Sequence, residues 1–180
     1  YNMLILAPAK AVCDDLWDAL PSLACVWWPS QFSAARPSSL YNTMFSRTAL
    51  AFFEARKRLL ESLVVTHRLN VLHLDADTVW FANPYPALKY GALAEHQLVV
   101  QPDLPLANAG VLYAQRIAPT DPAAWVLREL IERIRAFSFH PEVVGRLISW
   151  AKPPYFSNAD EQSILNDVLT SAISGQVTLT

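Results

Sequence analysis

The feature that most constrains this chain is an apolar stretch that ends in two acidic residues, VLHLDADTVW at residues 71–80. A short run rich in Val and Leu is typical of a buried β-strand. Unpaired carboxylates are costly to bury, so we expect Asp75 and Asp77 at the carboxyl end of this strand, where open α/β sheets bind ligands. Two carboxylates one residue apart suit a divalent cation that also holds a phosphate.

Composition and charge narrow the class of protein further. The 180 residues are 53% apolar and 17% charged, which predicts one domain, residues 1–180, with a substantial core. The net charge of −2 and the lack of a basic tract disfavour a nucleic-acid partner. No apolar run reaches the roughly 18 residues that a membrane span needs.

The rest of the sequence alternates between helix and strand patterns, which favours an α/β layered domain. Thirteen prolines against four glycines favour long connections over tight hairpins. Asp121 followed by Pro122 is a typical helix start. Helices are predicted at residues 14–20, 43–66, from 121 onward and at 160–174. Strands are predicted at residues 2–7, 24–28, from 71, at 97–101, 109–115 and 176–180.

The cysteines and histidines show no metal-ligand spacing. We expect Cys13 and Cys25 to be buried free thiols rather than a disulfide. His73 alternates with leucines inside the predicted strand and is expected in the core. No histidine is spaced for a zinc site or a nucleophilic triad.

Two later segments carry polar groups that suit a ligand. In LANAGVLY, residues 106–113, a small turn leads into an apolar strand. Gly110 lets the backbone approach a ligand closely, and the amide of Asn108 can donate to and accept from a hydroxyl. The helix predicted at residues 160–174 places Gln162 and Asn166 on one face. An ordinary turn and plain helix capping explain the same residues, so both interpretations stay open.

A basic stretch precedes the acidic strand. Arg56, Lys57 and Arg58 lie on the helix that leads into it. Cations beside a metal–diphosphate site would stabilise a departing phosphate. A solvated basic face is the alternative, and it suits two of the three residues.

The order of these segments resembles a known family. The strand with Asp-x-Asp, the Asn-Ala-Gly segment and the helix with (Asp/Glu)-Gln-x-x-x-Asn are similar to nucleotide-diphospho-sugar transferases of the GT-A type. Residues 72–84 and 108–113 are most similar to family 77 of plants and algae, which adds arabinose, xylose or galactose with retention. Family 8, which includes glycogenin and galactosyltransferases, shares the landmarks.

The resemblance implies a metal-dependent glycosyltransferase that moves a sugar from a nucleotide-diphosphate donor, such as a UDP-sugar, to a glycan or protein acceptor. The implied fold is α/β, with a Rossmann-like, mixed and mostly parallel sheet flanked by helices. The implied location is the Golgi lumen, with the full-length protein anchored in the membrane by a segment outside this chain.

The resemblance also assigns roles to the acidic pair and its surroundings. Asp75 and Asp77 would bind Mn²⁺ or Mg²⁺ and, through it, the diphosphate. Asn108 and Gly110 would lie against the donor sugar. The basic residue of the donor site would be Arg58 by the spacing of family 8, or Lys57 by that of family 77.

At the later helix, an acid from Asp160 or Glu161 would orient the sugar together with Gln162. The family usually has Asp-Gln here, so Glu161 stands in the aspartate position. The family's His-containing metal segment has no counterpart before Thr180. We therefore expect the domain to be cut short at its C-terminal end and the third metal ligand to lie beyond it.

Two other functions remain open on the sequence alone. The pattern Asp75, Asp77 and Val79 also suits a haloacid-dehalogenase-like phosphohydrolase, with Asp75 as nucleophile and Asp77 as acid/base. That motif normally occupies the first strand, whereas about seventy residues precede it here. The second alternative is a degenerate transferase-like domain that only binds a ligand or a partner.

Overall fold

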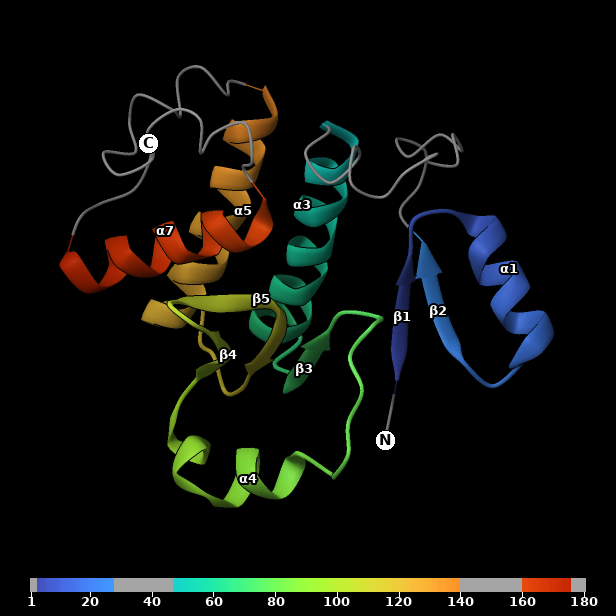
Figure 1. Cartoon of the computed structure of the whole chain (residues 1–180), viewed down its shortest axis with the longest axis horizontal. Helices are drawn as coiled ribbons and strands as arrows, with labels where there is room; N and C mark the ends of the chain where they lie inside the picture. Colours follow the sequence, from blue (N-terminus) through green and yellow to red (C-terminus); the bar gives the residue numbers. More distant parts are fainter. Residues whose placement is uncertain (1–2, 28–46, 140–159, 176–180) are drawn as a thin grey trace.

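The computed structural model describes residues 3–27, 47–139 and 160–175 of the chain. The described strands form two sheets, a parallel pair β1–β2 and an antiparallel sheet in the order β3-β5-β4 (Figure 1). In chain order the elements are β1 (Leu4–Ala7), α1 (Lys10–Ala19), β2 (Ala24–Trp27), α3 (Arg47–Glu61), the π-helical turn η1 (Ser62–Thr66), β3 (Val71–Leu74), α4 (Tyr85–Tyr90), the 3₁₀ turn η2 (Ala92–Glu95), β4 (Leu98–Asp103), β5 (Leu106–Ala114), α5 (Pro122–Phe139) and α7 (Glu161–Ser174).

The mixed α/β class is confirmed, but the mostly parallel sheet is wrong for the described strands. One described pairing is parallel and two are antiparallel. The physical reason is the short connection from β4 to β5, which consists of Leu104 and Pro105 and can join only neighbouring antiparallel strands. The expectation of long connections failed at this hairpin. Strand β5 then takes the central place, with Ala114 opposite both Val71 and Leu98.

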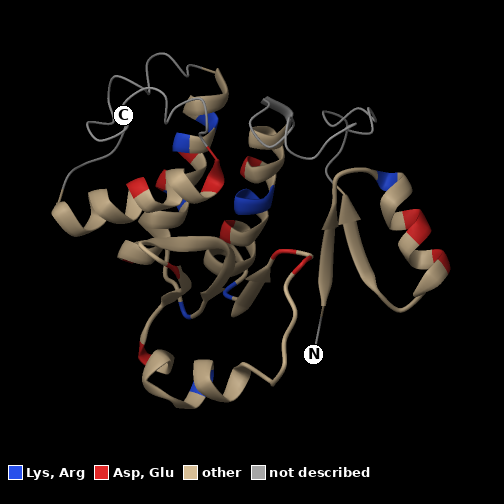
Figure 2. Ribbon diagram, in the orientation of Figure 1, with Lys and Arg blue, Asp and Glu red and all other residues tan. Residues whose placement is uncertain are grey.

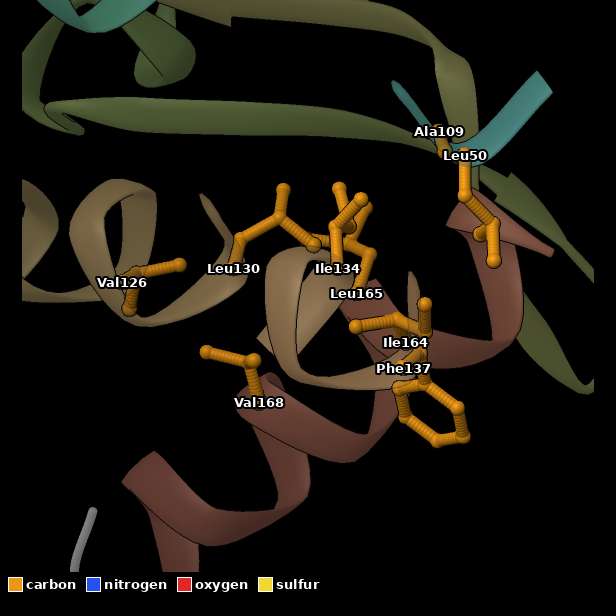
Figure 3. Close-up of a cluster of buried hydrophobic side chains, with 9 residues drawn as sticks. All are labelled: Leu50, Ala109, Val126, Leu130, Ile134, Phe137, Ile164, Leu165 and Val168. Carbon is orange, nitrogen blue, oxygen red and sulfur yellow. The ribbon is translucent and has the colours of Figure 1, made fainter. Parts of the chain in front are cut away.

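Helices α3, α5 and α7 cover one side of the antiparallel sheet, and α4 lies on the other (Figure 1). Their apolar faces meet in a cluster to which α3, β5, α5 and α7 all contribute, which Figure 3 shows. Leu130, Ile134 and Leu165 are fully buried in it. This core fixes the position of α3 and of the start of α7 relative to β5. The members of the cluster are Leu50, Ala109, Val126, Leu130, Ile134, Phe137, Ile164, Leu165 and Val168.

Most predicted elements are present with shifted ends. The helix predicted at residues 14–20 starts earlier, at Lys10, because its start has no side-chain cap that the sequence would reveal. The helix predicted at 43–66 is described from Arg47 and passes into the π-helical turn at Ser62. Helix α5 begins at Pro122 as predicted. The strand predicted at residues 176–180 lies outside the described residues.

A buried ion network joins α5 to α7. Arg133 contacts Glu129 at 2.8 Å and also pairs with Asp167 of α7. Glu129 and Arg133 lie four residues apart on α5, a spacing that brings their side chains together on one helical face. Since all three side chains are buried, the network fixes α7 against α5.

The expectation of free thiols is wrong, because Cys13 and Cys25 form a disulfide. Helix α1 packs back on the parallel pair β1–β2, which brings the two Cα atoms to 5.6 Å. That separation lies in the range that a disulfide requires. The sequence did not reveal this proximity, since it depends on how α1 packs on the strands. The disulfide sits among Ala7 and the partly buried Ile5, Leu16 and Trp17.

Reduction of this disulfide is expected to lower the free energy of unfolding by about 2–4 kcal/mol, as is typical for a loop of this size. The reason is that the linkage restricts the unfolded chain more than the folded one. Urea unfolding with and without a reducing agent measures the change. A Cys13→Ser/Cys25→Ser variant serves as the control, and its unfolding should not respond to the reductant. An equal response of both proteins would contradict the assignment.

No helix among the described residues is long and apolar enough to cross a lipid bilayer.

Candidate functional site

The acidic pair lies where β3 ends, as the sequence predicted. The backbone N–H of Asp75 still donates to the carbonyl of Gly110 on β5, at 2.8 Å. The Asp75 side chain is 41% exposed, and Asp77, two residues later in the turn after β3, is exposed. Both carboxylates are therefore accessible to a ligand, while Asp75 stays attached to the sheet.

Helix α3 presents Arg56 to this carboxylate. Its guanidinium contacts Asp75 at 2.7 Å and Glu161, the first residue of α7, also at 2.7 Å. Burial opposes the charge, but Glu161 and Asp75 more than offset it, so that the pKa of Arg56 lies above its ordinary value. The guanidinium also lies 5.5 Å from the ring centre of Phe53. Figure 2 shows basic residues on α3 and acidic stretches after β3 and at the start of α7.

Lys57 is fully buried next to Arg56. Its ammonium pairs with Glu161, donates to the carbonyl of Ala109 at 3.1 Å and lies 3.3 Å from Nε2 of His73. Burial lowers the pKa of Lys57, and the Glu161 carboxylate opposes that effect. These contacts connect α3, β3, β5 and α7 beneath Asp75.

His73 accepts from Lys57 as a neutral ring. Burial, together with the charges of Lys57 and Arg56, lowers the pKa of His73 to about 2. Because an ammonium group only donates, Nε2 of His73 must be the acceptor, and the ring proton then lies on Nδ1. His73 was predicted in the core, and its side chain is largely buried. It nevertheless makes a polar contact, with the ammonium of Lys57.

Asn108 and Gly110 lie inside β5, not in a turn before it as predicted. The side-chain oxygen of Asn108 accepts from the backbone N–H of Gly110 at 2.7 Å and of Val111 at 3.1 Å. Glycine at position 110 leaves room for the Asp75 carboxylate, since a Cβ there would lie 2.1 Å from Oδ2 of Asp75 and would force that side chain to move. The predicted close approach at Gly110 is therefore made by Asp75, with the backbone of β5 directly against the carboxylate.

The start of α7 brings the later polar residues to the same place. Asp160 is the N-cap and accepts from the backbone N–H of Ser163 at 2.7 Å, as the capping interpretation requires. Gln162 accepts from Ala109 N–H at 3.3 Å and donates to Asp103 at 2.9 Å. Of the two acids at this helix start, Glu161 is the one in contact with Arg56 and Lys57.

Arg58 is a predicted site residue that the structure does not bring to this cluster. It contacts Glu54 at 2.8 Å and Glu132 at 3.7 Å, and its side chain is 40% exposed. Arg56 takes the place beside Asp75 instead. The spacing of Glu54 and Arg58, four residues apart on one helix, suits a surface ion pair, but no sequence signal distinguishes Arg56 from Lys57 as the residue beside Asp75.

The residues present are compatible with a divalent cation. Asp75 and Asp77 offer hard oxygen donors of the kind that Mg²⁺ and Mn²⁺ bind, and the Asp75 carboxylate rests in a space that a Cβ at position 110 would fill. Within the described ranges no group of three His, Cys, Asp or Glu side chains is placed to hold a metal ion. A cation here would take two protein carboxylates and complete its coordination with phosphate and water.

A comparison with protein families agrees with this geometry. Residues 23–109, just under half of the chain, match the family model of the nucleotide-diphospho-sugar transferases. The matched segment contains Arg56, Lys57, Asp75, Asp77 and Asn108. We found no significant match among curated proteins or among solved structures. The match supports a glycosyltransferase-like function that uses a nucleotide-sugar donor, and it favours this function over the phosphohydrolase alternative.

Proposed function

We propose that this chain carries the donor site of a metal-dependent glycosyltransferase of the GT-A type, most similar to family 77. It transfers a sugar from a UDP-sugar to a glycan or protein acceptor with retention. The observation that carries this proposal is the convergence on Asp75. Arg56 of α3 and Gly110 of β5 are distant in sequence, and both lie against this one carboxylate. Arg56 also links it to Glu161 of α7.

In this proposal Asp75 and Asp77 hold Mn²⁺ or Mg²⁺, which supplies positive charge to the diphosphate of the donor. Arg56, beside Asp75, stabilises the negative charge that builds on the leaving diphosphate. Lys57 is fully buried and makes three contacts of its own, so it acts by holding Glu161 and the backbone of Ala109 in place. This arrangement supports a site that is preorganised before the donor binds.

The sugar would lie over β5 and the start of α7. Asn108 and Gly110 form the surface under it, and Gln162 and the acids Asp160 and Glu161 orient its hydroxyl groups. Asp160 is engaged as the N-cap, so Glu161 is the better supported of the two acids. Gln162 contacts both the backbone of β5 and Asp103, which fixes its amide for this role.

Retention follows from a reaction on one face of the sugar. The bond between the anomeric carbon and the diphosphate oxygen breaks, and its electron pair stays with the diphosphate. The acceptor hydroxyl attacks the same face, and its proton passes to the departing diphosphate. Glu161 is held by Arg56 and Lys57 and is therefore not free to act as a covalent nucleophile in this proposal. An inverted anomer in the product would contradict this route.

The disulfide supports a location in the secretory pathway. Disulfides persist in oxidising compartments and are rare in the cytosol. The link between Cys13 and Cys25 is thus consistent with the Golgi lumen, a location that was first inferred from the family resemblance alone.

Calorimetric titration with UDP, in the presence and absence of Mn²⁺, tests the proposal. The parent chain is expected to bind UDP only with the metal, and Asp77→Asn should abolish this metal-dependent binding. Asp77 is exposed, so the variant should unfold like the parent. Asp14→Asn, an exposed acid on α1, is the matched control and should bind as the parent does. A folded parent chain that binds no UDP would contradict the proposed function.

A further inference from the structure

Arg56 is shared between two carboxylates that come from different parts of the chain. One is Asp75, after β3, and the other is Glu161, at the start of α7, each at 2.7 Å. Each terminal nitrogen of the guanidinium serves one carboxylate. The planar fork of arginine allows this bridge, which the single ammonium of a lysine does not reproduce. Arg56 therefore determines where the Asp75 carboxylate lies.

Through this bridge the negative charge of Asp75 is already balanced by Arg56 before any ligand binds. Two cations, Arg56 and Lys57, are balanced by two anions, Asp75 and Glu161. A divalent cation approaching Asp75 meets a carboxylate oxygen already occupied and a positive guanidinium beside it. The positive charges of the cation and of the guanidinium repel each other strongly, because water is partly excluded between them. A metal ion at Asp75 would therefore compete with Arg56 for this carboxylate.

The guanidinium is able to leave Asp75 without leaving the site. Its second contact, with the buried Glu161, would keep it near α7. Its Nε is buried and makes no hydrogen bond within the described residues, so the present arrangement does not use all of its donors. A diphosphate offers several oxygens to a planar fork of donors and is a ligand that arginine binds well.

We infer that Arg56 makes metal binding at Asp75 dependent on the nucleotide, by holding Asp75 in the empty site and releasing it to the cation when a diphosphate takes up the guanidinium. The inference rests on the proposed function and adds a positioning role for Arg56. By thermodynamic linkage, the nucleotide then tightens metal binding by the same factor by which the metal tightens nucleotide binding. Metal alone binds weakly, and metal with nucleotide binds well.

The test measures Mn²⁺ affinity by electron paramagnetic resonance, with and without saturating UDP, in the parent chain and three variants. Arg56→Gln removes both the charge and the bridge. Arg56→Lys keeps the charge but cannot span both carboxylates. Arg58→Gln removes a neighbouring cation that does not contact Asp75 and is the control. Circular dichroism confirms folding, and Arg56→Lys, which keeps a cation beside Glu161, decides the question if Arg56→Gln fails to fold.

Both Arg56 variants are expected to bind Mn²⁺ alone on the order of tenfold more tightly than the parent, the size of an ordinary coupling effect. The gain from UDP should shrink by the same factor, and Arg58→Gln should behave as the parent. If Arg56→Lys binds Mn²⁺ as the parent does, the repulsion between two positive charges is enough to explain weak metal binding. The role inferred for the Arg56 bridge is then overturned. If neither variant changes the affinity for Mn²⁺ alone, or the parent binds no Mn²⁺ under either condition, the inference also fails.

A parent that binds Mn²⁺ but never UDP refutes the proposed function, and the nucleotide-dependent part of the inference with it. The measurements with Mn²⁺ alone then still decide whether Arg56 holds Asp75.

Discussion

Replacing Lys57 with methionine is expected to lower the free energy of unfolding by about 3–5 kcal/mol, the usual cost of removing one partner of a buried ion pair. Methionine fills much of the space of the lysine stem, so little cavity forms. The cost arises because Glu161, only 5% exposed, loses one of its two cations. The carbonyl of Ala109 also loses a donor. Urea unfolding followed by circular dichroism measures the change.

The neighbouring arginine provides a matched control. Arg58→Met removes one cation from the next position of the same helix, but that side chain is 40% exposed and pairs with exposed or half-buried acids. Its expected cost is at most about 1 kcal/mol, typical of surface ion pairs.

A second variant separates the buried charge from other effects. In Lys57→Met the buried Glu161 carboxylate keeps only Arg56 as its cation. Adding Glu161→Gln removes that buried charge and should recover part of the loss, since residues in contact are not additive. Equal losses for Lys57→Met and Arg58→Met would contradict the buried ion pair.

The local patterns of the sequence predicted the parts of the fold that depend on local physics. The apolar run before Asp75, the Asp121–Pro122 helix start and the Asp160 cap each follow from a few neighbouring residues. The sheet arrangement did not follow in this way. The position of β5 between β3 and β4, and the parallel or antiparallel direction of each pairing, depend on packing between segments that are far apart in sequence.

The candidate site divides in the same manner. The family resemblance, which was based on motif order, implied that Asp75, Gly110 and the start of α7 share one site, and the structure brings these residues close together. The choice among Arg56, Lys57 and Arg58 was beyond the sequence, because consecutive helical residues point about 100° apart and only the rotation of α3 decides which one faces Asp75. The disulfide was missed for a similar reason, since it depends on how α1 packs against β2.

Gly110→Ala is expected to weaken metal-dependent UDP binding by about 10–100-fold, the range seen when residues that support a metal ligand are changed. The added methyl group would lie 2.1 Å from Oδ2 of Asp75, so the carboxylate must move. The backbone contact between Asp75 N–H and Gly110 carbonyl, at 2.8 Å, does not involve the new atom and should persist. The unfolding free energy should change by about 1 kcal/mol or less, because the end of a side chain yields more readily than backbone.

The same substitution at a glycine outside the site provides the comparison. Gly91→Ala adds a methyl group 3.1 Å from the backbone oxygen of Ala87, at the end of α4 and away from Asp75. Calorimetry with Mn²⁺ and UDP should find Gly91→Ala unchanged in binding and Gly110→Ala strongly weakened. Unchanged binding in Gly110→Ala would mean that the position of the Asp75 carboxylate does not matter to the ligand. The convergence of β3, β5 and α3 on this one carboxylate would then serve folding alone, and the donor site would have to be sought elsewhere in the chain.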